Sequence, residues 1–341
     1  MALPERDLCP PQKISMAWQQ ICGVGGGLYN LGSTCFINSI LQCLTYTPPL
    51  ANCLLSHEHS QPCAEQGFCM ICTMEVHMKE VLFCSGSAVL PVTVVSELPQ
   101  ETISKKPLSG AFLRRKTLGI ANCLPSSELQ LPFISGCDSS SQASTLIHQI
   151  FGGFLRSRVT CFNCKAISDT YKAFHDILLD VNVKSSSVTE ALKDFLKPEQ
   201  PDGHKCGKLQ LWGLCLCSRC AQLASASKRL MINHPINVLA LCLKRFDAFS
   251  DRKISKACIQ VVWYLEHLDL STYVYRAAGE PLLYSLYGVL VHEGFSCNSG
   301  HYYCFVKASD GWWYKMNDDS VVLCNIETVL CQHAYLLFYD R

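Results

Sequence analysis

A thiol nucleophile is the first candidate for chemistry in this chain, and it stands at Cys35. It ends the segment Asn30-Leu-Gly-Ser-Thr-Cys35, and the residues after it carry apolar side chains at helical spacing. A thiol attacks as the thiolate, an ion that the positive end of a helix dipole favours. The N–H groups of a helix start, with the side-chain amide of Asn30, could donate to the oxyanion of a tetrahedral intermediate. The alternative is that Cys35 is one more small buried hydrophobic residue.

A nucleophilic thiol needs a general base, and the base needs an orienting group. His301 opens the aromatic run HYYCFVK, which is typical of a β-strand, and Asn317 ends another aromatic run sixteen positions later. An antiparallel neighbour could there present its amide to the imidazole. Cys, His and Asn in this chain order are known in thiol hydrolases. His292 is the rival base, but it lies within the preceding strand and lacks such a partner downstream. Taken singly, His301 would be a structural histidine, and the joint pattern reverses that preference.

Two cysteine pairs have the spacing of a zinc site. Cys161-Phe-Asn-Cys164 and Cys217-Ser-Arg-Cys220 are both Cys-x-x-Cys, a turn that places two thiolates on one Zn²⁺ at about 2.3 Å. The gap between the pairs is wider than in a compact zinc ribbon, and two neighbours, Cys206 and Cys215, compete for the second pair. Reduced structural thiols are the alternative.

A second group of metal-ligand types follows the first helical segment. It contains His57, His59, Cys63, Cys69 and Cys72, from which His57 and the three thiols could bind a second zinc ion. Its irregular spacing favours the alternative, a solvated loop with partly buried thiols.

Composition restricts the compartment and the partners. The 341 residues include 23 Cys, and 29 Lys plus Arg balance 28 Asp plus Glu, for a net charge of +1. Without a basic excess, nucleic-acid binding is disfavoured. Residues 1–27 lack the apolar run of a signal peptide, and we find no membrane-spanning run, which predicts a reducing compartment, cytosolic or nuclear. Cysteines within apolar runs are then expected in the core, among them Cys43, Cys242, Cys304 and Cys331.

The elements that would position these residues are helices near the N-terminus and strands in the C-terminal half. The helical spacing after Cys35 runs to Pro48-Pro49, with Ser33 and Thr34 as capping residues. From residue 146 onward, β-branched and aromatic runs such as NVLALCLKRF predict an antiparallel region, with one amphipathic helix at SVTEALKDFLKP. Residues 1–26 end in a Gly-rich run and are expected to be flexible. Residues 85–145 are Ser-rich without a clear period and are expected to be disordered.

The terminal motifs resemble the ubiquitin-specific protease family. LYNLGSTCFINSILQCL is similar to the Cys box of that family, and YGVLVHEGFSCNSGHYYCFVK with WWYKMNDDSV and AYLLFYDR is similar to its His box. NVLALCLKRF resembles its central strand motif, while CMICTMEVH and TLIHQIFGGFLRS are closer to its cytokine-inducible, DUB-type subfamily. The resemblance implies an α+β, papain-like cysteine protease fold with palm, thumb and fingers. It would occupy residues 27–341, with zinc-bearing fingers at about 155–235.

For the site, the resemblance implies a thiol-dependent deubiquitinase that hydrolyses the isopeptide or peptide bond after the C-terminal glycine of ubiquitin. Cys35 would be the nucleophile, His301 the general base and Asn317 the orienting residue. Asn30 would complete the oxyanion hole, and Asp318 is a further contributor. A structural Zn²⁺ is expected and no catalytic cofactor. The expected partners are ubiquitin and ubiquitinated proteins, bound by a monomer in the nucleus or cytoplasm, and association with the endoplasmic reticulum is allowed.

The chain departs from the family pattern in one block. Where the family carries an acidic helical motif of the Gln-Glu-Asp-Ala-His-Glu-Phe kind, residues 85–145 show nothing similar, and the acids between positions 100 and 145 are Glu101, Glu128 and Asp138. In the family this helix packs beside the catalytic helix, with its acids facing the ubiquitin tail. The departure implies weaker affinity for ubiquitin. It also defines the alternative function, a catalytically impaired relative that binds ubiquitin.

Overall fold

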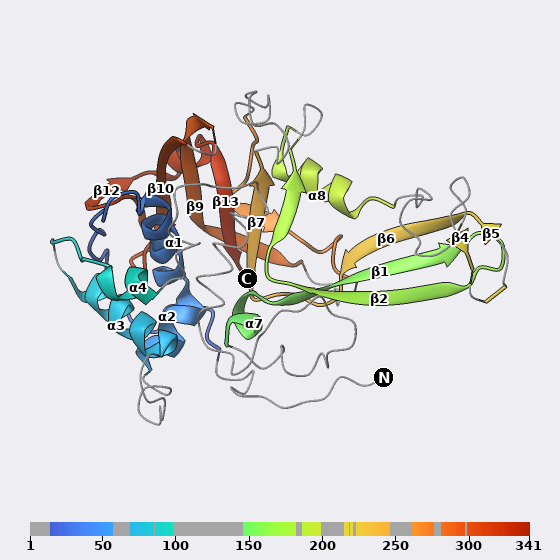
Figure 1. The fold of residues 1–341 in the computed structure, drawn as a ribbon, viewed down its shortest axis with the longest axis horizontal. Helices are drawn as coiled ribbons and strands as arrows, with labels where there is room; N and C mark the ends of the chain where they lie inside the picture. The colour runs from blue at the N-terminus through green and yellow to red at the C-terminus, as the bar shows by residue number, and fades with distance from the viewer. Residues whose placement is uncertain are drawn as a thin grey trace.

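A computed structural model describes the fold in three parts (Figure 1): a group of helices, a large central sheet and a long arm of strands. The residues described are 14–56, 69–84, 86–97, 146–181, 186–198, 215–217, 219–220, 223–245, 261–275, 281–296 and 299–341. Within them, no helix combines the length and the apolar character that crossing a bilayer requires.

The helical part comprises α1 (Cys35–Thr45), α2 (Pro48–Leu55), α3 (Met70–Phe83) and the short α4 (Val92–Glu97). The helix predicted after Cys35 is confirmed, and every residue of α1 is buried. Pro48 and Pro49 follow the end of α1 and also form the first turn of α2. Proline suits this position because its φ is fixed near the helical value and its missing N–H is not needed there. Thr34 is the N-cap residue of α1, but its side chain makes no capping hydrogen bond, unlike the expected cap.

The central eight-stranded sheet has the order β12-β11-β10-β9-β13-β7-β3, and β8 also pairs with β9. All of these pairs are antiparallel except β3 with β7, so the predicted antiparallel region is confirmed in its main part. The strands are β3 (Ile177–Asp180), β7 (Val238–Lys244), β8 (His267–Asp269), β9 (Leu283–Ser296), β10 (Ser299–Lys307), β11 (Trp313–Asn317), β12 (Ser320–Cys324) and β13 (Ala334–Asp340). The short helix α10 (Ile326–Leu330) joins β12 to β13.

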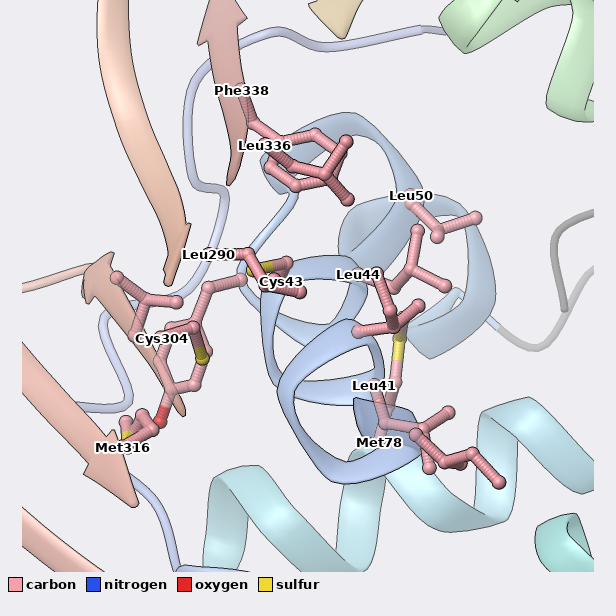
Figure 2. Packing of buried hydrophobic residues seen from close by; sticks show 14 of the residues in the cluster. Leu41, Cys43, Leu44, Leu50, Met78, Leu290, Cys304, Met316, Leu336 and Phe338 are labelled. Carbon is pink, nitrogen blue, oxygen red and sulfur yellow. The ribbon is translucent and has the colours of Figure 1, made fainter. Parts of the chain in front are cut away.

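Two hydrophobic cores cover the two faces of this sheet because side chains alternate along each strand. Cys304, Leu336 and Phe338 face the helical part, and Figure 2 shows them with Leu41, Cys43 and Leu44 of α1. The intervening residues, such as Phe305 and Leu337, face the other core, which the predicted amphipathic helix, α8 (Val188–Leu196), also joins. The nucleophile's helix is therefore packed directly against the strands that carry the predicted base.

The arm consists of β1 (Gly153–Cys161), β2 (Ile167–Phe174) and β6 (Ala226–Ile232), with the two-residue strands β4 (Cys215–Leu216) and β5 (Leu223–Ala224) at its tip (Figure 1). The helix α7 (Leu146–Phe151) precedes it. Along the middle of the arm, Asp169 accepts hydrogen bonds from Arg156 at 2.6 Å and from Arg158 at 2.9 Å, and the Arg156 guanidinium lies 3.7 Å from the ring centre of Tyr275. These contacts join the arm to the loop after β8.

The Gly-rich run before Cys35 differs from the flexible segment that we expected. Gly25, Gly26 and Gly27 are buried, and a Cβ on each would lie 2.1, 2.4 and 2.5 Å from a backbone oxygen of Val81, Ser87 and Asp319 respectively. We call these three residues the glycine strap. Glycine is needed here because two backbones approach too closely for any side chain, so the run is packed. The rest of the N-terminal segment before residue 14 lies outside the described residues.

The atypical block begins later than the sequence suggests. Residues 86–97 belong to it, yet Val89 pairs with Leu28, and Val94 of α4 is buried in the core that contains α1. The remainder, residues 98–145, lies outside the described residues, so the structure does not test whether it is disordered.

Candidate functional site

Cys35 is the first residue of α1 and is 9% exposed. Burial raises the pKa of its thiol, and the charge of Asp318 acts in the same direction, while a backbone hydrogen bond at Tyr302 opposes them. The sequence pattern indicated the helix dipole but not this desolvation. A raised pKa favours the protonated thiol, so a nucleophilic Cys35 would need a base to take its proton.

His301 and Asn317 are in direct contact. The β10–β11 ladder pairs Cys304 with Met316, which places Asn317 diagonally across from His301 on the same face of the sheet. The imidazole Nε2 lies 2.5 Å from Oδ1 of Asn317. Because an amide oxygen only accepts, Nε2 carries the proton, and Nδ1 is the nitrogen with a lone pair. The arrangement orients the ring and selects the tautomer that can take up a thiol proton.

Asp318 lies beside this pair but is held by other partners. It sits in the tight turn between β11 and β12 with a φ of 50°, a left-handed conformation that Asp tolerates better than most residues. Its Oδ2 is 3.9 Å from Nε2 of His301, whereas it accepts a hydrogen bond of 2.9 Å from Asn30. Its Oδ1 accepts a hydrogen bond of 2.8 Å from Asn38. The carboxylate is thus tied to the N-terminal half of the chain.

The side chain of Asn30 shapes the loop that leads to Cys35. Its Oδ1 accepts from the backbone N–H groups of Gly32, Ser33 and Thr34 at 3.0, 3.0 and 3.1 Å. With the oxygen so placed, Nδ2 donates one hydrogen to Asp318. An amide nitrogen carries two hydrogens, so Asn30, which is exposed, keeps a second N–H beyond the one that it donates to Asp318.

His292, the rival base, lies on β9, where it pairs with Tyr302 of the strand that carries His301. Its ring centre lies 4.4 Å from that of Tyr302, and a Cβ on Gly300 would lie 2.3 Å from its Nε2. Burial and the neighbouring His301 lower the pKa of His292 to about 4. Its position favours a packing role, so the structure supports the preference for His301 as the candidate base.

The two cysteine pairs predicted for zinc meet at the tip of the arm. The Sγ atoms of Cys161, Cys164, Cys217 and Cys220 all lie within 4.8 Å of one another, and those of Cys164 and Cys217 are 3.6 Å apart. Four sulfurs at about 2.3 Å from a tetrahedral zinc would be about 3.8 Å apart, so the donor set fits this ion. The two competing cysteines are not tested, because the side chain of Cys215 and the whole of Cys206 lie outside the part of the chain that the structure describes.

The electrostatics of this cluster also suit a cation. The backbone N–H groups of Cys220 and Arg219 lower the pKa of Cys217 to about 6. The N–H of Ala166 acts in the same direction on Cys164, but desolvation and the neighbouring thiols outweigh it and raise the pKa of Cys164 to about 11. Several adjacent thiolates repel one another unless a positive ion lies between them, and these four cysteines could hold zinc.

The second predicted metal group is tested only in part. His57, His59 and Cys63 lie outside the described residues, while Cys69 is buried just before α3 and Cys72 lies on that helix. Among the residues that the structure describes, neither thiol belongs to a group of three or more ligands that could hold a metal ion.

Most of the cysteines assigned to the core are there. Cys43, Cys242 and Cys304 are buried, as predicted. Cys331 is exposed, so its assignment was wrong: it follows α10 at the surface, where an apolar run in the sequence does not imply burial.

Asn38 is a site residue that the sequence motifs did not single out. It lies one turn after Cys35 on α1, is 2% exposed and donates to Asp318. An available signal was its polarity on a helix whose other buried positions are mainly apolar.

Comparisons with known proteins agree with this geometry. Residues 26–339 match the family described as "Ubiquitin carboxyl-terminal hydrolase". The chain is 45% identical over 346 residues to human "Ubiquitin carboxyl-terminal hydrolase 42", covering 100% of this chain and 25% of that protein. It is 40% identical over 343 residues to human "Ubiquitin carboxyl-terminal hydrolase 17-like protein 13", covering 99% of this chain and 60% of that protein. The chain therefore spans a quarter and about three fifths of these two relatives.

Solved structures show the same fold. A chain of the yeast SAGA deubiquitinase module superposes with a TM-score of 0.71 at 28% identity, covering 92% of this chain and 68% of that one. A chain of the SAGA module of Ubp8, Sgf11, Sus1 and Sgf73 bound to monoubiquitin superposes with a TM-score of 0.66 at 25% identity, covering 98% and 72%. The predicted α+β, papain-like fold is thereby confirmed. Since the family match extends over residues 26–339, the chain belongs to the ubiquitin carboxyl-terminal hydrolase family, the ubiquitin-specific proteases that its terminal motifs resemble.

Proposed function

We propose that this chain is a cysteine-type deubiquitinase that hydrolyses the isopeptide or peptide bond after the C-terminal glycine of ubiquitin. The observation that carries the proposal is the contact of 2.5 Å between His301 and Asn317, on the strands against which the helix of Cys35 packs. Family membership supports the reaction class, and a solved relative bound to monoubiquitin supports ubiquitin as the partner.

In the proposed reaction, Nδ1 of His301 accepts the thiol proton of Cys35, and Sγ attacks the carbonyl carbon of the terminal glycine. The second N–H of Asn30 and the backbone N–H of Cys35 donate to the developing oxyanion. The imidazolium then protonates the leaving amine, which leaves a thioester on Cys35. Water, deprotonated by the same imidazole, releases ubiquitin and regenerates the thiol.

Asn317 accepts from Nε2 and keeps the ring in the productive tautomer throughout the cycle. An amide does this without the full negative charge of an aspartate, so the imidazolium gains less stabilisation from it. Asp318 at 3.9 Å from Nε2 supplies a negative charge nearby. The carboxylate therefore offers part of the electrostatic support that Asn317 lacks.

Within the same proposal, residues 27–341 form one protease domain, and its arm, at about 155–235, is the fingers region. Cys161, Cys164, Cys217 and Cys220 would hold a structural Zn²⁺ there, which would cross-link the ends of the strands. The arm needs such a link because its strands expose much of their surface, as the burial of β2 shows.

The test is hydrolysis of ubiquitin that carries a fluorogenic amide at its C-terminus. The wild type is expected to release the fluorophore, and Cys35→Ala is expected to release none. Cys331→Ala, which removes an exposed thiol at the end of α10, is the matched control and should retain activity. A wild type that binds ubiquitin but shows no turnover would instead establish the catalytically impaired relative.

A further inference from the structure

Asn38 connects the helix of Cys35 to two segments, the residues just before Asn30 and the β11–β12 turn. Its Nδ2 donates to Oδ1 of Asp318 at 2.8 Å and lies 3.2 and 3.3 Å from the backbone oxygens of Leu28 and Tyr29. All of these partners only accept, so the carboxamide has one possible orientation. Its Oδ1 is buried without a partner among the described residues, a cost that is offset by what the N–H groups hold.

The contacts continue from Asp318 to the oxyanion candidate. Asn38 holds one carboxylate oxygen of Asp318, and the other accepts from Nδ2 of Asn30 at 2.9 Å. The backbone N–H of Leu28 donates to the carbonyl oxygen of Asp318 at 2.8 Å. The β11–β12 turn and the segment before Asn30 are therefore joined twice, once through backbone and once through side chains.

We propose that Asn38 is a positioning residue of the thiol site. Its carboxamide fixes the Asp318 carboxylate, and through it the amide of Asn30, so that one N–H of Asn30 is occupied and the other faces the substrate. It also keeps Asp318 turned toward α1, which leaves Asn317 as the direct partner of His301. The inference rests on the proposed function and adds to it the residue that organises the oxyanion donor.

Gln42 supplies a matched control on the same helix. It lies one turn beyond Asn38, is also 2% exposed, and its Nε2 donates to the backbone oxygen of Gly26 at 3.0 Å. This hydrogen bond ties α1 to the glycine strap and not to Asp318 or Asn30. Removing either carboxamide costs stability, but only the loss of Asn38 should disturb the oxyanion donor.

The experiment compares wild type, Asn38→Ala and Gln42→Ala in fluorogenic ubiquitin hydrolysis and in alkylation of Cys35 by iodoacetamide. Asn38→Ala is expected to lower kcat by about 10²-fold with KM little changed, because a mispositioned oxyanion donor acts on the transition state. No oxyanion forms when iodoacetamide alkylates Cys35, so the alkylation rate of Asn38→Ala should stay within about twofold of the wild-type rate. Gln42→Ala should keep kcat within about threefold of the wild type.

A charge exchange tests the same link without removing volume. Asn38→Asp places two carboxylates together and should lower kcat further, while adding Asp318→Asn returns a hydrogen bond in the reverse direction. The double variant is expected to recover kcat at least about tenfold over Asn38→Asp alone. The comparison of Asn38→Asp with the double variant tests the role of Asn38 even if Asn38→Ala does not fold.

Three results would overturn the inference. They are a wild-type kcat in Asn38→Ala, a parallel loss of kcat and alkylation rate in that variant, and a double variant no more active than Asn38→Asp. An inactive wild type with normal alkylation of Cys35 would overturn the proposed function and this inference with it.

Discussion

Gly27 offers the sharpest test of how the N-terminal segment supports the site. A Cβ on this residue would lie 2.5 Å from the carbonyl oxygen of Asp319, 2.6 Å from its carbonyl carbon and 2.7 Å from the carbonyl oxygen of Asp318. These are backbone atoms of a tight turn and cannot rotate away. In Gly27→Ala, either the glycine strap or the turn must therefore move by most of an ångström.

The cost follows from the contacts that the movement breaks. Overpacking of this kind costs about 1–3 kcal/mol, and the hydrogen bond of 2.8 Å from Leu28 to Asp318 contributes about 1 kcal/mol more. We expect Gly27→Ala to lower the free energy of unfolding by about 2–4 kcal/mol. A turn displaced by about 1 Å also shifts Asn317 relative to His301, which should lower kcat by about 10²-fold.

The assay is urea unfolding followed by fluorescence, with hydrolysis of fluorogenic ubiquitin measured in parallel. The control is Gly23→Ala: Gly23 has a φ of 66°, and an added Cβ there would meet no atom within 4 Å. This variant should lose about 1 kcal/mol from backbone strain alone and keep kcat. If Gly27→Ala is no less stable than Gly23→Ala and retains the wild-type kcat, the reasoning about the glycine strap is refuted.

Three further predictions concern the arm, a buried histidine and the turn before Cys35. Cys220→Ser should lose the zinc that the wild type binds at about one ion per chain, measured by metal analysis, whereas Cys331→Ser should keep it; equal metal contents would contradict the site. Burial lowers the pKa of His77 to about 4. As the pH falls below about 6.5, the histidine therefore binds a proton in the unfolded chain but not yet in the native state. The free energy of unfolding should then fall by about 2 kcal/mol between pH 7 and pH 5 because of this residue. His77→Leu should show a correspondingly flatter stability profile in urea titrations, and an unchanged slope would count against the assignment. Ser33 has a φ of 81°, a conformation that glycine adopts more easily than serine or valine. Ser33→Gly should therefore raise the free energy of unfolding by about 0.5–1 kcal/mol, and Ser33→Val should lower it. The opposite order of urea midpoints would be inconsistent with backbone strain at this turn.

Features carried by local patterns could be predicted from the sequence. Apolar spacing after Cys35 identified α1, and the two Cys-x-x-Cys pairs identified the four thiols that gather at the tip of the arm. β-Branched and aromatic runs such as NVLALCLKRF identified strands, and the two faces of these strands line two cores. Each of these signals lies within one element or one turn, where backbone geometry links spacing to position.

Local patterns gave wrong predictions where the burial of a residue depends on segments that are distant in the sequence. The Gly-rich run before Cys35 has the composition of a flexible segment, yet it is packed because Val81, Ser87 and Asp319 approach its backbone. An apolar run around Cys331 suggested a core position, but no described element covers that residue enough to bury it. The composition of a segment indicates which conformations it can adopt, but it does not indicate which other segments will pack against it.

The sequence by itself determined the family and the candidate site residues, through a thiol at a helix start, a histidine and an asparagine on aromatic strands, and motifs of one family. The tertiary structure alone decided how the site is held together. The hydrogen bonds that Asp318 accepts from Asn30 and Asn38 join residues 288 and 280 positions apart, and burial raises the pKa of the Cys35 thiol. Such contacts depend on the relative placement of whole elements, which no spacing along the chain encodes.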